Sequence, residues 1–99
     1  MRLVLASLAL ATLAACGPVQ STAALIDADV ELEAARAAGA AQASPYEFYG
    51  AEAYLKKARE VTGRAQYESA SRLATKATVL AKEARKNAVA ASNRDRENP

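Results

Sequence analysis

Cys16 is the only cysteine of the 99 residues, and the chain contains no histidine. The sequence before it carries a positive charge on Arg2 and continues with an almost uninterrupted apolar run over residues 3–13. A run of roughly 7–15 apolar residues after a basic start is typical of a secretory signal peptide, whereas a membrane-spanning helix needs about 20. The small residues Ala14 and Ala15 let the chain lie extended in a peptidase groove. We therefore expect residues 1–15 to form a cleaved signal peptide.

The end of this segment, Leu13-Ala14-Ala15-Cys16, resembles the lipobox of bacterial lipoproteins. The resemblance implies that the Cys16 thiol accepts diacylglycerol and that the new amino terminus carries two or three acyl chains. Two or more chains anchor a protein stably, whereas a single chain binds a membrane only marginally. Gly17 follows in place of aspartate, and by the same resemblance this favours sorting to the outer membrane, with the domain in the periplasm. The alternative is a secreted protein whose cysteine follows the cleavage site by chance.

The composition excludes most kinds of catalytic and metal site. Without histidine, and with the cysteine assigned to lipid, the chain lacks the residues of most metal sites, of Ser/His/Asp or Cys/His nucleophile systems and of an internal disulfide. Loss of Arg2 with the signal leaves 12 basic and 11 acidic residues, a balance that gives no general attraction for nucleic acid. We therefore expect a protein without metal or cofactor that is not an enzyme. A carboxylate pair is the only chemistry left to the enzyme alternative.

Alanine supplies 27 of the 99 residues and loses no side-chain entropy in a helix, which predicts an all-α fold. Removal of residues 1–15 leaves 84, enough for one small domain with a thin core. We expect a small antiparallel three-helix bundle, made of an N-terminal helix and a helical hairpin. A lipidated N-terminus and flexible spacer over 16–21 precede the alanine-rich helical domain over 22–92, and a polar disordered tail over 93–99 follows it.

Residues that favour helix starts and helix ends predict the bounds of the helices. The first helix is expected over Thr22–Ala41, and the third from about residue 65 or 66 to Ser92. The second begins at Pro45, because Ser44, Pro45 and Glu47 have the order of a capping box with proline at the first helical position. Gly63 is the expected terminator of the second helix, since glycine readily takes the left-handed conformation.

Each expected helix carries an apolar stripe with a spacing of three or four residues. In the first helix the stripe consists of Ala23, Ile26, Val30, Ala34, Ala37 and Ala41, widened by Leu25 and Leu32. In the second it consists of Phe48, Ala51, Tyr54, Leu55, Ala58 and Val61. In the third it consists of Ala70, Ala74, Ala77, Ala81, Ala84, Ala88 and Ala91. An alanine row lets helix axes approach to about 8 Å, and we assign it to the bundle core in preference to a homo-oligomeric coiled coil.

The stretch from Ala40 to Ala84, above all SPYEFYGAEAYLKKAREVTGRAQYESASRLATKATVLAKEA, resembles the DUF4398 family of bacterial envelope proteins. The shared features are a Pro-aromatic helix start, a short glycine-containing turn and a regular alanine spacing after a tyrosine. The resemblance implies a small helical lipoprotein or envelope module and names no reaction. A weaker similarity, of the segment around Tyr67–Ala77 to a tetratricopeptide repeat, covers about one unit, whereas stable arrays need three or more.

Charge and aromatic residues indicate where the domain could bind a partner. From Gly17 to Leu55 there are six acidic residues and one basic residue, and from Lys56 to Pro99 eleven basic and five acidic residues. We expect the acidic first helix to pack beside the basic third helix. The alternative is a basic surface that meets anionic lipid headgroups or peptidoglycan. Tyr46 and Tyr49 are the candidate partner-binding residues, because they are the aromatic residues expected to lie partly exposed.

The leading functional hypothesis is a non-enzymatic, lipid-anchored envelope protein that acts as a structural or protein-interaction module in the periplasm. Its partners would be the membrane, through the lipid on Cys16, and an envelope protein or peptidoglycan. The alternative is an alanine-zipper oligomer that associates with peptidoglycan and resembles the murein lipoprotein. Pro45 and Gly63, which interrupt a long helix, oppose this alternative, as does the absence of a C-terminal lysine for covalent attachment.

Overall fold

The computed structural model describes the backbone of residues 1–98 and the side chains of residues 1–8 and 17–98. Within this part the regular structure is entirely helical, which confirms the all-α prediction. The elements are α1 (Arg2–Ala37), α2 (Ala40–Ala43), α3 (Pro45–Gly63) and α4 (Tyr67–Glu97). The side chains of the predicted lipobox, Leu13, Ala14, Ala15 and Cys16, lie outside the described residues.

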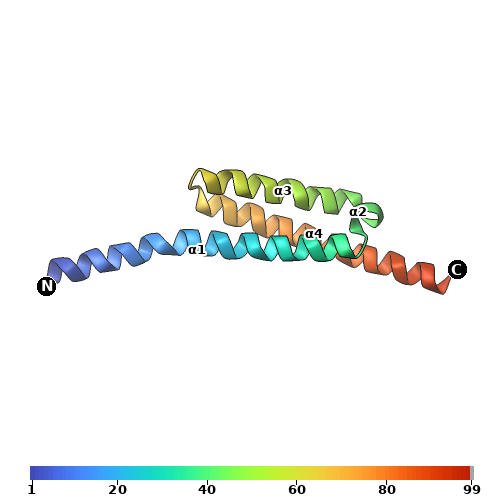
Figure 1. Ribbon diagram of the computed structural model, residues 1–99, viewed down its shortest axis with the longest axis horizontal. Coiled ribbons are helices and arrows are strands. Elements are labelled where there is room, and N and C mark those ends of the chain that lie inside the picture. Colours follow the sequence, from blue (N-terminus) through green and yellow to red (C-terminus); the bar gives the residue numbers. More distant parts are fainter. Residues whose placement is uncertain (99) are drawn as a thin grey trace.

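The three long helices lie side by side, as Figure 1 shows. α3 runs back along α1, and α4 runs back along α3, so that α1 and α4 are parallel. α4 packs extensively against both other helices, whereas α1 and α3 contact each other much less. The N-terminal part of α1 projects beyond one end of this arrangement and the C-terminal part of α4 beyond the other, which gives extents of 74 × 21 × 14 Å.

The core is built around the predicted alanine row of α4. Its first six members are buried and Ala91 is half-buried, so the periodicity identified the packed face of this helix correctly. The predicted face of α3 is confirmed as well, with Tyr54 half-buried and the other five residues buried. Phe48 and Leu55, at 2% and 1% exposed, supply much of the apolar volume that the alanines lack. Small side chains on α4 therefore allow close helix packing, and α3 fills the remaining space.

The main row of the predicted core stripe of α1 is wrong, whereas Leu32, which was predicted to widen it, is buried and Leu25 packs against the core. Ala23, Ile26, Val30 and Ala37 are exposed, and Ala34 and Ala41 are only half-buried. The other buried residues of α1 are Ser21, Ala28 and Ala35, which were not predicted. Since residues of a helix are 100° apart, Ala28 and Val30 point in nearly opposite directions. α1 has an apolar row on each of two sides, and the row with Ala28 and Ala35 faces the core because small residues permit close approach to α4.

The ends of two helices also differ from the prediction. α1 begins at Arg2 instead of Thr22 and includes the expected flexible spacer, in which Ser21 is 1% exposed. It ends at Ala37 instead of Ala41, because Gly39 adopts φ 84° and starts the short α2. α4 continues through the expected disordered tail to Glu97, since no glycine or proline interrupts this stretch.

The turn between α3 and α4 uses a different left-handed residue from the one predicted. Gly63 is the last helical residue of α3, and Ala65 adopts φ 60°. The amide of Gln66 donates to the carbonyl of Val61 at 2.9 Å, and that of Ala65 to the carbonyl of Thr62 at 3.0 Å. These two bonds form a Schellman motif, in which Ala65 occupies the position that glycine usually takes.

Candidate functional site

A groove of about 600 Å³ lies between α1 and α3, where these helices stand apart over α4. Its floor includes Leu32 and Leu55, two buried residues of the core. Its walls carry both signs of charge, from Asp29, Glu33, Arg36, Glu52, Lys56 and Arg59. The groove is therefore a polar surface feature that lies directly over the apolar core.

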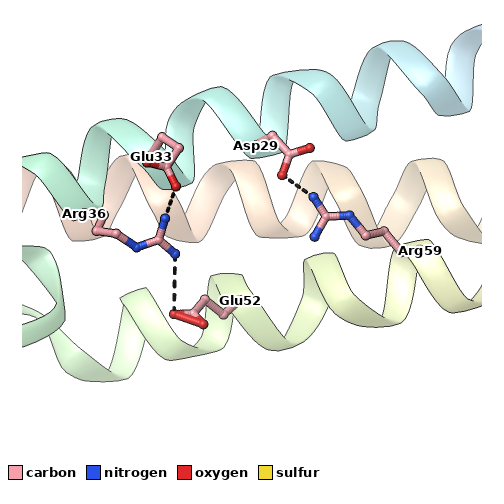
Figure 2. A network of polar contacts seen from close by, with 5 residues as sticks. All are labelled: Asp29, Glu33, Arg36, Glu52 and Arg59. Carbon is pink, nitrogen blue, oxygen red and sulfur yellow. Dashed lines mark hydrogen bonds and ion pairs between the residues drawn. The ribbon is translucent and has the colours of Figure 1, made fainter.

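Two arginines bridge the groove in opposite directions, as Figure 2 shows. Arg59 of α3 donates a hydrogen bond to the carboxylate of Asp29 on α1. Arg36 of α1 donates to Glu33 on its own helix, and its other terminal nitrogen lies 3.9 Å from a carboxylate oxygen of Glu52 on α3. All five side chains are 40–70% exposed. Each pair is therefore worth about 0–1 kcal/mol. The two pairs that join α1 to α3 affect the alignment of these helices more than the stability of the fold.

Tyr49 forms one edge of the same groove, and the buried Phe48 packs beneath it. The guanidinium of Arg36 lies 5.6 Å from the centroid of the Phe48 ring, a distance at which cation–π attraction operates. Phe48 and Tyr49 meet edge to face, with centroids 5.2 Å apart. Because Phe48 is buried and Tyr49 is 56% exposed, the pair connects the core to the groove surface. Tyr49 thus presents a rigidly supported ring beside a mixed-charge wall.

The start of α3 forms a second polar cluster, which joins α3 to α4. The Ser44 hydroxyl donates to the carboxylate of Glu47 at 2.6 Å and accepts from the side-chain amide of Asn87 at 3.0 Å. The donation from Ser44, with a bond from the Glu47 backbone amide, holds the pKa of the Glu47 carboxyl below its ordinary value. Ser44 precedes α3 as predicted, but its hydroxyl makes no bond to a backbone amide of the helix. The capping box is therefore replaced by a side-chain link to α4.

Of the predicted site residues, the two tyrosines are exposed but do not lie in one site. Tyr49 lines the groove between α1 and α3, whereas Tyr46, 82% exposed, lines a separate hollow with Asn87 and Arg94. Gly17 lies against the start of α4, and a β carbon built there would be 3.7 Å from Cβ of Tyr67. The lipobox residues belong to the undescribed side chains.

The acidic N-terminal half pairs with both other long helices. Only one described ion pair joins α1 to α4, between Arg85 and Glu31 at 3.6 Å. The pairs Arg59–Asp29 and Arg36–Glu52 join α1 to α3. Sequence reasoning missed Arg36, Arg59 and Asn87 as linking residues. The alternation of acids along α1 was the available signal, since it places Asp29 and Glu31 on opposite flanks of the helix.

Neither metal binding nor membrane spanning has support among the described residues. No group of three His, Cys, Asp or Glu side chains is placed there to hold a metal ion. Among the described residues, no helix combines the length and apolarity needed to cross a bilayer.

No protein-family model, no curated protein and no solved structure matches the chain.

Proposed function

We propose that the chain is a bacterial lipoprotein of the envelope, in which residues 1–15 are removed and Cys16 carries the lipid. In this proposal the mature part is a three-helix domain of the DUF4398 type at the periplasmic side of the outer membrane. It acts without catalysis, as a module that holds an envelope protein or peptidoglycan. The observation that carries the proposal is the sequence Leu13-Ala14-Ala15-Cys16, which resembles a lipobox and immediately precedes Gly17, a residue that lies against Tyr67 of α4.

The exposure of the N-terminal segment supports removal of this part of the chain. Leu3, Val4, Leu5 and Leu8 are 66–85% exposed. They belong to the N-terminal part of α1, which projects beyond the packed helices (Figure 1). A row of exposed apolar side chains needs cover from a membrane, a receptor or a partner. Cleavage before Cys16 removes all four and keeps Gly17, which lies against Tyr67, and the buried Ser21.

The packing of Gly17 implies how the domain would stand on a membrane. Because Gly17 lies against Tyr67, the anchor emerges beside the turn between α3 and α4. α4 begins at this end and extends over about 46 Å, with its charged C-terminal turns farthest from the anchor. Tyr46, Tyr49 and the groove therefore face the periplasm and are available to a partner. The murein-lipoprotein alternative calls for one long unbroken helix. The helices of this chain are instead interrupted at Gly39 and Ala65, which have positive φ.

The anchor is tested by Cys16→Ser, with Ser7→Ala as the control substitution. We expect the Cys16→Ser chain to leave the membrane fraction and the Ser7→Ala chain to stay in it. Metabolic labelling with a fatty-acid analogue is expected for the control chain alone. Labelling of the Cys16→Ser chain, or its retention in membranes after residues 1–15 have been removed, would contradict the assignment.

The interaction role is tested by photocrosslinking from the two exposed tyrosines. A photoreactive amino acid at Tyr46 or Tyr49 is expected to capture an envelope protein or a peptidoglycan fragment in cells, identified by mass spectrometry. The same group at Glu60, exposed on α3 and outside the groove, is the control. Equal capture from all three positions would count against a defined binding surface.

A further inference from the structure

One face of the domain, formed by α1 and α4 alone, carries exposed apolar side chains. Val30 of α1 and Val79 of α4 are each 61% exposed, and Val89 of α4 is 46% exposed. Val30 and Val89 line shallow hollows between the two helices, and α3 contributes no residue to these hollows. We define the α1–α4 face by Asp27, Val30, Glu31, Lys82 and Lys86, which border the hollows, and by Val79. Val79 follows Thr78 of one hollow and points away from the core, because it lies two residues from the buried Ala77 and Ala81.

The two helices of the α1–α4 face carry opposite charges. On α1 the valine is accompanied by Asp27 and Glu31, and on α4 the residues along the same hollows are Lys82, Arg85 and Lys86. Val30, Glu31 and Lys82 border one hollow and so lie at the same level along the helices. The face is therefore a pair of parallel ridges, one acidic and one basic, each with exposed valine.

We propose that the α1–α4 face binds a second copy of the chain in a parallel two-fold dimer. A two-fold axis that runs along the helices places α1 of each protomer over α4 of its partner, which brings acidic ridges onto basic ridges and Val30 near the partner's Val79. A two-fold axis across the helices places α1 on α1, with Asp27 and Glu31 facing their own copies. Like charges in contact oppose that second arrangement, so the charges select the parallel one.

The parallel arrangement also agrees with a lipid anchor, a step that rests on the proposed function. Both Gly17 ends point the same way, so both Cys16 anchors reach one membrane. The defined residues span about 11 Å of α4, from Val79 to Lys86, and two helix widths, so a dimer buries roughly 400–500 Å² in total, well below the roughly 1,200 Å² of a typical specific interface. Confinement to one membrane raises the effective concentration and favours such a small interface.

The test is disulfide cross-linking in membranes between two differently tagged chains, one with Val30→Cys and one with Val79→Cys. Both positions are exposed, so the substitutions leave the core unchanged, and circular dichroism checks this. We expect a product with both tags, and no such product when Val79→Cys is replaced by Glu60→Cys on α3. The unsubstituted chain, whose only cysteine is Cys16, is the blank. Cross-linking of Val30→Cys mainly to itself, or a mixed yield no higher than the Glu60→Cys control, would overturn the proposal.

Charge reversal provides a second readout that does not depend on the cysteines' reactivity. Lys82→Glu with Lys86→Glu is expected to lower the mixed yield about tenfold, the effect of losing two exposed ion pairs and gaining repulsion. The same reversal at Lys56 and Lys57 of α3 is expected to leave the yield unchanged. An equal effect of both double reversals would refute the assigned ridges. The cross-linking is repeated in solution with chains that also carry Cys16→Ser. A mixed product from these chains would support the dimer even if the lipid anchor is refuted, so the two proposals are tested separately.

Discussion

Ala81 tests whether the alanine row of α4 determines how closely the helices pack. Its side chain is 0% exposed in the middle of the core. Ala81→Leu adds three carbon atoms, which would stabilise the fold by about 2 kcal/mol if space were available. Close packing leaves no such space, so we expect the helices to be forced apart at a cost of about 3 kcal/mol. For a domain of this size, that loss lowers Tm by at least about 12 °C.

The assay is thermal unfolding by circular dichroism of the protein purified in mild detergent. Ala90→Leu is the matched control, because Ala90 is exposed on the same helix. Alanine and leucine have similar helix propensity, so the substitution itself changes little there. We expect the control to stay within about 0.5 kcal/mol of the parent chain. A higher Tm for Ala81→Leu would show that the core has unfilled volume and would refute the close-packing argument.

Two further predictions concern the turn between α3 and α4 and the start of α3. Ala65→Gly is expected to raise the free energy of unfolding by about 1 kcal/mol, because Ala65 is left-handed at φ 60°; urea unfolding showing no gain would contradict the Schellman turn. Ser44→Ala is expected to lower the free energy of unfolding by about 1 kcal/mol, since Asn87 loses its acceptor. The same change is expected to return the Glu47 pKa upward toward 4.5, as measured by NMR titration. Because the folded-state pKa is depressed, ionised Glu47 stabilises the parent chain above the unfolded pKa, and this contribution is lost as the pH falls through the folded pKa. An unchanged Glu47 pKa in Ser44→Ala would refute this coupling.

The helices with one apolar face could be predicted in detail. Pro45 sets the first turn of α3, and the row from Ala70 to Ala88 leaves a single side of α4 for the core. In both cases local propensity, punctuation and periodicity favour the same arrangement. Such agreement makes sequence reasoning reliable for both the boundary and the buried face.

The turns and the polar links could not be predicted from the local sequence, because they depend on contacts with residues far along the chain. Ser44 has the sequence context of a cap, yet Asn87, 43 positions away, donates to its hydroxyl. Gly63 is the better left-handed residue, yet Ala65 occupies that conformation, because the chain must turn where Val61 and Tyr67 can reach their places in the packed region. The groove depends on Asp29 and Arg59, 30 positions apart, whose meeting requires the fold itself.

The apolar stripe of α1 with Ile26 and Val30, wrongly assigned to the core, is exposed for a physical reason. Ile26 and Val30 are larger and more apolar than Ala28 and Ala35, so a rule that buries the most hydrophobic row selects the wrong side. The core selects by fit, and the alanine row of α4 accepts small residues. A helix that needs only one apolar side for its own domain still keeps valine and isoleucine on the other, about half of each side chain exposed to water. Exposed apolar surface of this kind favours association. On α1 it lies beside Asp27 and Glu31, which select a basic partner surface, and the α4 helix of a second copy presents one.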